Sequence, residues 1–194
     1  MGTYLNVGCG THYAQGWVNT DVSRDELTTP DIVIDPTKPY PFEDNHFDAI
    51  YLGHVLEHVA WWAVPDFLAD MKRIAKPGAE ILIVGPDVFK TIQRWAQKLE
   101  PWWLVMSALE HQDFVVPGAE PARGGASHHW NCHHDRVWQL LTDAGFDEIK
   151  NMFNRIPNDP TGTSWTDVKT KITWPVVGKY YWQFAISCKA PLSK

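Results

Sequence analysis

Short apolar runs alternate with turn-forming residues over the first ninety positions of the chain. Five of these runs predict β-strands, at residues 4–7, 17–22, 31–35, 47–52 and 80–84. Runs of this length between turn signals are typical of a parallel sheet. Two further strands are expected at 146–152 and 179–189, separated by a polar connection at 155–175 that is rich in proline and threonine.

Three segments show the apolar spacing of an α-helix. The first covers 65–75, with a proline in its first turn and Lys76-Pro77-Gly78 at its end. The third covers 135–144, with Asp135 as a candidate N-cap and Gly145 as the left-handed residue after the helix. The second runs from about 86 to 99, and its inner side is predicted to carry Val88, Ile92, Trp95, Ala96 and Leu99.

Elements in this order predict an α/β fold: a Rossmann-like, doubly wound, mostly parallel sheet with an antiparallel last strand. The length of 194 residues fits a single domain, 1–194. Residues 100–130 are less regular, and a stretch this long inside a compact domain is typical of a lid or an acceptor-binding segment. Trp102, Trp103 and Trp130 are the candidates for the wall of an acceptor pocket.

Composition narrows the classes of function. A net charge of −6 argues against a protein that tracks nucleic-acid phosphates, which needs clustered Lys and Arg. No apolar run is long enough for a membrane span, and no secretory signal is visible at the N-terminus. Cys9, Cys132 and Cys188 cannot all pair within one chain, so reduced thiols and a cytoplasmic location are expected.

The strongest chemical signal is a strand, a glycine turn, a second strand and an acidic residue at its end. Gly8 and Gly10 allow a ligand to approach the backbone closely, where a Cβ atom would collide. Asp21 follows Gly8 by thirteen residues and is placed to accept hydrogen bonds from a ribose diol. This arrangement favours a nucleoside lying across the carboxyl ends of parallel strands. The alternative for Asp21, and for Asp35 after the third strand, is an ordinary turn former.

Six segments extend this signal over residues 4 to about 90. They read Leu5-Asn6-Val7-Gly8-Cys9-Gly10, Gly16-Trp17-Val18-Asn19-Thr20-Asp21, Tyr40-Pro41-Phe42-Glu43-Asp44-Asn45-His46-Phe47-Asp48, His54-Val55-Leu56-Glu57-His58, Ala75-Lys76-Pro77-Gly78-Ala79 and Gly85-Pro86-Asp87. In this order and spacing the chain resembles the class I S-adenosylmethionine-dependent methyltransferases, and among them a short bacterial and phage group. The resemblance implies the fold and the cofactor, with S-adenosylhomocysteine as product, but it does not specify the methyl acceptor.

The cofactor-binding residues that the resemblance implies are Asn6, Gly8, Cys9, Gly10, Asp21, Val22, Asp35, Pro36, Gly53 and His54. The turn at 6–10 would lie along the methionine part of the cofactor. Asp21 would hold the ribose hydroxyls and Val22 would pack on the adenine. Asp35 would take the adenine amino group with Pro36 beside the ring, while Gly53 and His54 would face the methionine carboxylate and the sulfonium.

The chain departs from the family pattern in two places. The first motif often has an acidic residue where Asn6 stands, although the short group commonly has Asn. Only six residues separate Gly10 from Trp17, too few for the usual full first crossover helix. A more open pocket on that side is expected. Cys9 fits the turn by its small size and is not expected to be reactive.

Histidines are the candidates for acid–base catalysis. His54 and His58 follow the fourth strand, and His133 and His134 precede a helix N-terminus, whose partial positive charge favours neutral imidazole. A neutral imidazole can act as general base on an acceptor hydroxyl. Solvated loop histidines are the alternative, and Glu57 and His58 could simply cap a helix start. The set His128, His129, Cys132, His133 and His134 could ligate a metal, but its spacing matches no known structural zinc pattern, so no metal is expected.

These observations predict a methyltransferase that moves a methyl group to a small molecule or a saccharide, with a hydroxyl as the expected acceptor. The turn after the fourth strand lacks the Asn/Asp-Pro-Pro-aromatic motif of DNA amino-methyltransferases, and the chain has no Pro-Cys of the cytosine-C5 enzymes. A non-catalytic S-adenosylmethionine-binding protein on the same fold remains an alternative. An NAD-linked oxidoreductase is a second, though the third glycine of its motif and a Tyr-x-x-x-Lys pair are missing.

Overall fold

A computed structural model describes residues 2–101, 105, 128–157, 164–175 and 180–192. Seven strands form one sheet in the order β3-β2-β1-β4-β5-β9-β6. The first five strands in that order are mutually parallel, and β9 is antiparallel to both β5 and β6. The predicted α/β fold, mostly parallel with an antiparallel last strand, is confirmed. The strands are β1 (Tyr4–Val7), β2 (Val18–Asp21), β3 (Ile32–Val33), β4 (Phe47–Gly53), β5 (Ala75–Pro86), β6 (Asp147–Asn151) and β9 (Gln183–Lys189).

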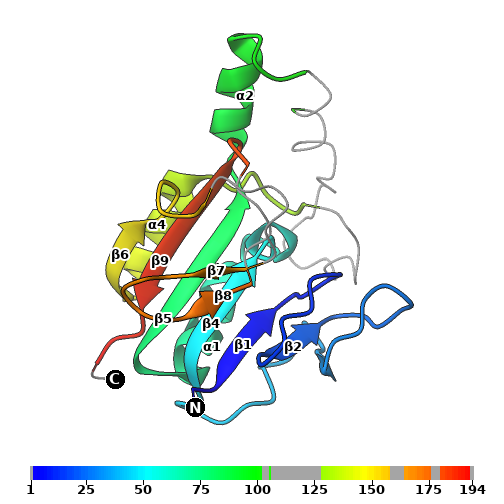
Figure 1. Cartoon of the computed structure of the whole chain (residues 1–194), viewed down its shortest axis with the longest axis vertical. Coiled ribbons are helices and arrows are strands. Elements are labelled where there is room, and N and C mark those ends of the chain that lie inside the picture. The colour runs from blue at the N-terminus through cyan, green and yellow to red at the C-terminus, as the bar shows by residue number, and fades with distance from the viewer. Residues whose placement is uncertain (1, 102–104, 106–127, 158–163, 176–179, 193–194) are drawn as a thin grey trace.

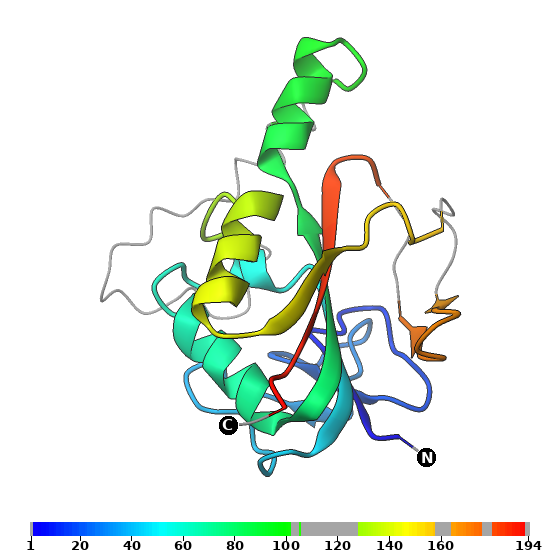
Figure 2. The same cartoon turned by 90° about the vertical axis from the view of Figure 1, so that its left-hand side faces the viewer.

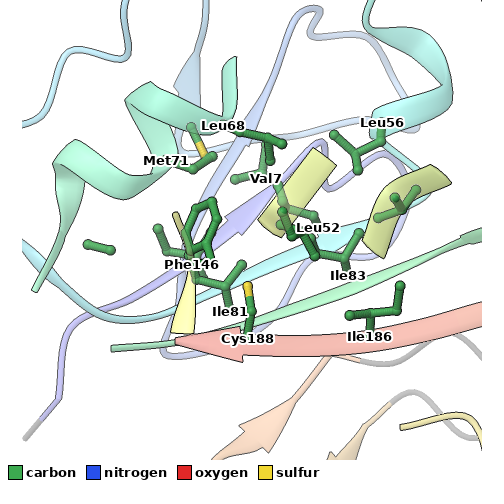
Figure 3. Close-up of a cluster of buried hydrophobic side chains, with 14 of the residues drawn as sticks. Val7, Leu52, Leu56, Leu68, Met71, Ile81, Ile83, Phe146, Ile186 and Cys188 are labelled. Atoms are coloured by element: carbon green, nitrogen blue, oxygen red, sulfur yellow. The ribbon is translucent and has the colours of Figure 1, made fainter. Parts of the chain in front are cut away.

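Helices α1 (Val64–Ile74) and α4 (His134–Asp143) cover one face of this sheet, as Figures 1 and 2 show. Their apolar stripes pack on inward-facing strand residues to form the main core, which Figure 3 shows around Leu52, Ile81 and Ile186. Leu52 and Ile186 have no exposed surface and Ile81 has 1%. Close packing of this cluster fixes the strand ends from which the site residues project.

Aromatic side chains cover the opposite face of the sheet. A small hairpin of β7 (Trp165–Thr166) and β8 (Thr173–Trp174) lies there, within the stretch predicted as a polar connection. Trp174 is buried against Trp17, with ring centroids 5.6 Å apart, and both belong to a second apolar cluster with Tyr51 and Met152. Several of the chain's eleven tryptophans therefore serve as packing residues rather than as ligand platforms.

Helix α2 (Val88–Ala96) corrects one prediction. The sequence places Ile92, Trp95, Ala96 and Leu99 on its inner side, but all four are exposed. The buried positions are Val88 and Thr91. The helix follows β5 directly and projects beyond the end of the sheet (Figure 1), so after its first turn no sheet lies beneath it.

Four element boundaries also differ from the prediction. β3 keeps only two residues of the expected 31–35, and β5 begins at Ala75 instead of residue 80, directly after α1. β9 begins at Gln183, because Tyr180 N–H donates to Gln183 Oε1 (3.1 Å) and the chain turns before the strand. The N-cap of α4 is His133, not Asp135: the His133 ring accepts a hydrogen bond from Arg136 N–H (3.3 Å), and Asp135 lies inside the helix.

Candidate functional site

The carboxyl ends of β1, β2 and β4 meet at one edge of the sheet. Strand β1 lies between the other two, with Val7 opposite Thr20 on one side and Leu52 on the other. The glycine turn, Asp21 and the Gly53-His54 pair therefore emerge side by side, although they lie up to 46 residues apart in the sequence. In open α/β sheets this edge is where ligands bind.

The turn after β1 needs glycine for two different reasons. Gly8 has a φ of +59°, and a Cβ atom there would lie 2.8 Å from Val55 Cγ2. Gly10 has a φ of +50°, but no atom of the described residues would lie within 4 Å of its Cβ. These residues leave the space above Gly10 open, so the backbone of the turn can approach a ligand there. The turn is tied to β2 by a hydrogen bond from Cys9 N–H to Thr20 O (2.9 Å).

Asp21 is held in place by the backbone on both sides of it. Its Oδ2 accepts from Gly10 N–H at 2.7 Å, and its Oδ1 accepts from Val22 N–H at 2.8 Å. Ser23 N–H donates to Oδ1 as well, at 3.4 Å. A carboxylate has about four acceptor positions, so this partly exposed group keeps capacity for a hydroxyl of a diol. Val22, next to it, exposes 42% of its surface and offers an apolar platform for a ring.

An asparagine network takes the place of the missing crossover helix between β1 and β2. Buried Asn19 accepts at Oδ1 from Asn6 Nδ2 (2.9 Å) and from Ala14 N–H (2.8 Å). Its Nδ2 donates to Ala14 O, Trp17 O and Asp31 Oδ2. The Asn6 side chain therefore points into this network, where it also donates to the backbone of the following loop. Because the side chain is engaged there, the cofactor contact predicted for Asn6 would involve its backbone, and it stays a prediction.

Asp35 is engaged within its own turn. Its carboxylate accepts from Thr37 N–H (3.0 Å) and Thr37 Oγ1 (2.6 Å) and pairs with Lys38 Nζ (2.9 Å). The hydrogen bonds from Thr37 and Lys38 lower the pKa of this carboxyl well below its ordinary value. Both Asp35 and Pro36 are exposed. The geometry is that of a turn former, and a contact of these two residues with adenine stays a prediction.

His54 connects the end of β4 to a buried carboxylate. Its backbone has a φ of +56°, which is unusual for a residue with a side chain and marks a strained position. The ring donates from Nδ1 to Glu57 Oε1 (3.0 Å) and accepts at Nε2 from Gln183 Nε2 (2.5 Å). Glu57 lies in the 3-10 turn η1 (Leu56–His58) and has no exposed surface. A carboxylate that orients an imidazole in this way is an arrangement suited to general-base catalysis.

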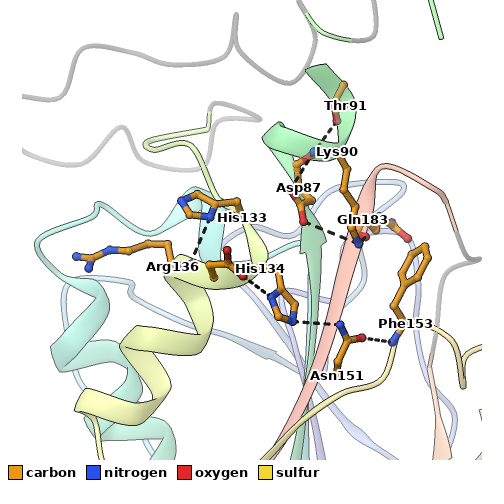
Figure 4. Close-up of polar contacts among 10 residues, drawn as sticks. Asp87, Lys90, Thr91, His133, His134, Arg136, Asn151, Phe153 and Gln183 are labelled. Atoms are coloured by element: carbon orange, nitrogen blue, oxygen red, sulfur yellow. Dashed lines mark hydrogen bonds and ion pairs between the residues drawn. The ribbon is translucent and has the colours of Figure 1, made fainter. Parts of the chain in front are cut away.

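His133 and His134 lie on the same carboxyl-terminal side of the sheet, but farther along the strand order. His133 caps α4 and its ring lies 4.4 Å from that of Phe89, just after β5. His134 contacts Asp135 Oδ1 (2.8 Å) and Asn151 Nδ2 (3.2 Å), as Figure 4 shows. Asn151 is the last residue of β6, which is the outermost strand and runs parallel to β5, and three strands lie between β6 and β1. The catalytic role of these two histidines stays a prediction.

Burial keeps all three cysteines protonated. It raises the pKa of the Cys9 thiol to about 11, with Asp21 and Asp31 adding to the effect, and raises the pKa of Cys132 and Cys188 as well. All three are free thiols. Because the thiolate is the reactive form, Cys9 suits the turn by its size rather than by reactivity.

We expect these thiols to react with a disulfide reagent at pH 8 only after unfolding. The native protein should show slow, incomplete labelling, and the protein in denaturant should show three rapid equivalents. Absorbance of the released thiolate measures both. Rapid labelling of one equivalent in the native protein would contradict the burial described for these residues.

Sequence reasoning missed the partners that hold the site together. Asn19 stands in a recognised segment but was assigned no role, and the five hydrogen bonds of its side chain are visible only in three dimensions. Glu57 was considered only as a cap for a helix start. The signal that could have indicated a role in the site was its place between His54 and His58, in a segment that carries the resemblance. The sequence gives no indication of a role for Gln183, because its side chain contacts that of His54 although the two residues are 129 positions apart.

Two kinds of comparison agree with this geometry. Residues 5–83 match a family model described as a methyltransferase domain. The chain is 32% identical over 91 residues to the ubiquinone/menaquinone biosynthesis C-methyltransferase UbiE of Burkholderia multivorans, covering 42% of this chain and 36% of that protein. It is 37% identical over 60 residues to a 2-phytyl-1,4-naphtoquinone methyltransferase of Trichormus variabilis, covering 28% and 25%. The chain thus spans about a third or less of these curated relatives.

Solved structures extend the likeness over the whole chain. A SAM-dependent methyltransferase from Methanosarcina mazei superposes with a TM-score of 0.56 at 18% identity, covering 99% of this chain and 93% of that one. Another, from Archaeoglobus fulgidus, gives 0.55 at 15% identity, covering 96% and 85%. Residues 5–83 are therefore similar to a methyltransferase domain, and the chain has the fold of the class I S-adenosylmethionine-dependent methyltransferases.

Proposed function

We propose that the protein is a methyltransferase that binds S-adenosylmethionine at the edge formed by β1, β2 and β4 and methylates a small molecule. The observation that carries the proposal is the joint placement of the open backbone at Gly10 and the fixed carboxylate of Asp21. The residues present fit this cofactor: a side chain at Gly10 would fill the open space, and Asp21 offers acceptors to a diol. When bound, the cofactor supplies a methyl group on a sulfonium.

The chain's own residues then bind and orient the reactants. The backbone of the turn lies along the amino-acid end of the cofactor, Asp21 holds the ribose, and Val22 supports the ring. Such positioning supplies most of the rate enhancement in a displacement that needs three atoms in line. His54 is the proposed general base, because Glu57 orients its ring. An acceptor hydroxyl would take the place of the Gln183 amide at His54 Nε2.

A hydroxyl is the acceptor that this base can serve. His54 Nε2 would take the proton of this hydroxyl, and the bound cofactor would supply the methyl group that its oxygen accepts, with the electrons of the carbon–sulfur bond staying on sulfur. A second candidate is a ring carbon of a hydroquinone, favoured by the curated relatives that are named as quinone methyltransferases. Removing the proton of a ring hydroxyl raises electron density at the neighbouring carbon, so the same base serves both. A saccharide acceptor and a cytoplasmic location stay predictions.

The described part of the chain has no helix that is long and apolar enough to cross a membrane. The acceptor segment predicted at 100–130 falls largely outside the described residues, and so do Trp102 and Trp103. Trp130 is described: it donates from Nε1 to Leu56 O (2.8 Å) and packs against the main core. This bond fastens the chain at Trp130 onto η1. The position of Trp130 is explained by these contacts, and its role in the wall of an acceptor pocket stays a prediction.

Calorimetric titration with S-adenosylhomocysteine tests the cofactor. We expect micromolar binding to the wild type, no binding of NAD, and about tenfold weaker binding by Asp21→Asn, because a charge-assisted hydrogen bond to a ligand is weakened. Asp25→Asn is the matched control, since Asp25 is an exposed carboxylate that caps the next turn through Leu27 and Thr28 N–H. Absence of S-adenosylhomocysteine binding in the wild type would refute the proposed function.

A further inference from the structure

We propose that Glu57, His58 and His128 form a binding site for a divalent transition-metal ion of the zinc class. One ligand atom from each of these side chains lies within 4.8 Å of the others. Two imidazole nitrogens and one carboxylate oxygen are a set found in catalytic zinc and non-haem iron sites. The proposal departs from the expectation of no metal, which considered the spacing of 128–134 and did not include Glu57.

The first line of support is the state of the Glu57 carboxylate. The residue is fully buried, and within the described part of the chain its Oε2 has no hydrogen-bond partner, while Oε1 accepts from His54. A buried carboxylate oxygen without a partner is costly in the interior unless a cation completes it.

The second line of support is the way the backbone brings His128 to His58, seventy positions apart. His129 N–H donates to Glu57 O (2.7 Å), and Trp130 Nε1 donates to Leu56 O (2.8 Å). These two bonds fasten the segment after residue 127 onto η1. The His58 and His128 rings then meet edge to face, with centroids 5.1 Å apart. The site is built from two segments that are fixed to each other by hydrogen bonds outside it.

Donor chemistry decides the class of metal. Ligand atoms around one zinc ion lie about 3.3 Å apart, given bonds of about 2 Å in a tetrahedral arrangement. Both histidines are partly exposed, and rotation of their rings can close the remaining distance. Magnesium and calcium prefer all-oxygen sites, so they are disfavoured here. The bond from His54 to Glu57 resembles the outer-shell bonds that orient carboxylate ligands in metal sites.

Three protein ligands leave coordination positions for an oxygen of another molecule. The site follows β4, at the edge where the proposed cofactor would bind, so that oxygen can belong to the methyl acceptor. A metal ion would lower the pKa of such a hydroxyl and assist His54. This role of the metal rests on the proposed function, whereas the binding site itself does not.

Titration of the metal-free, tag-free protein with Zn²⁺ tests the site directly. We expect one equivalent to bind with micromolar or tighter affinity, and Co²⁺ in the same site to show ligand-field absorption bands. His58→Gln and His128→Gln should each weaken Zn²⁺ binding about tenfold or more. Glu57→Gln should do the same, but because Glu57 is buried that change also bears on folding, and the two histidine variants decide the test.

His134→Gln is the matched control, because His134 also lies beside a carboxylate, that of Asp135, but contacts β6, the outermost strand of the sheet. It should bind Zn²⁺ as the wild type does. The site is overturned if the wild type binds no zinc, if both histidine variants bind it unchanged, or if Mg²⁺ competes on equal terms. Titration with S-adenosylhomocysteine without metal is scored separately, so failure of the metal site and failure of the proposed function give different results.

Discussion

Replacing Gly10 with alanine should weaken S-adenosylhomocysteine binding more than about a hundredfold while the protein stays folded. Two features of the turn produce this expectation. A φ of +50° costs a residue with a side chain about 1–2 kcal/mol, which a folded protein can tolerate. The new Cβ would lie more than 4 Å from every atom of the described residues. It would therefore collide with the bound ligand and not with the fold. Calorimetry measures the binding, and thermal unfolding measures the stability.

Gly16→Ala is the control for the backbone cost. Gly16 has a φ of +82° and also has open space around its Cβ, but it stands beside β2 at the end of the 11–16 loop, away from the turn. Both variants should lose similar stability, and only Gly10→Ala should lose binding. Gly8→Ala is the contrasting case, because its Cβ would lie 2.8 Å from Val55 and should destabilise the fold itself. Equal binding by the Gly10 and Gly16 variants would exclude the turn as the cofactor site.

The part of the site that could be predicted from sequence is the part that short-range rules determine. Gly8 and Gly10 belong to the turn after β1 and Asp21 is the last residue of β2, and parallel strands present their carboxyl ends at one edge. The ends of strands can be predicted from apolar runs, so these positions followed from the pattern. The same rule drew attention to Asp35, whose carboxylate is engaged by Thr37 and Lys38, and its contact with adenine stays a prediction.

Contacts between distant segments were not predictable in this way. Glu57 and His128 become neighbours only because the backbone of 129–130 bonds to η1. The apolar spacing at 88–99 was read as a buried face, yet such spacing does not say where the sheet ends. The doublet His133-His134 drew attention because it precedes a helix N-terminus, and its members were found capping α4 and contacting β6. Contacts between distant segments, rather than residue type, distinguish His54, whose ring meets Glu57 and Gln183.

Substituting Asn19 with alanine should destabilise the protein by about 3 kcal/mol, because several buried groups lose their partners together. Asn6 Nδ2 and Ala14 N–H would lose their shared acceptor, and Trp17 O would lose its donor. No helix lies between β1 and β2 to hold residues 11–16 otherwise, so the loop should detach from the sheet and cofactor binding should weaken with it. Chemical denaturation measures the loss. Asn154→Ala, at an exposed turn, should stay within about 0.5 kcal/mol of the wild type.

Exchanging the amide of Asn19 and the carboxylate of Asp31 tests whether the hydrogen bonds of Asn19 are responsible for this stability. Asn19→Asp keeps the acceptor for Asn6 and Ala14 but places a second carboxylate where Asn19 Nδ2 now donates to Asp31 Oδ2 at 3.1 Å. That variant should be destabilised near pH 7 and less so near pH 4, where one carboxylate takes up a proton. Adding Asp31→Asn removes the repulsion and restores a donor between the two side chains. The double variant should therefore be more stable than Asn19→Asp by more than about 1 kcal/mol, whereas additive losses would mean that the two residues act independently.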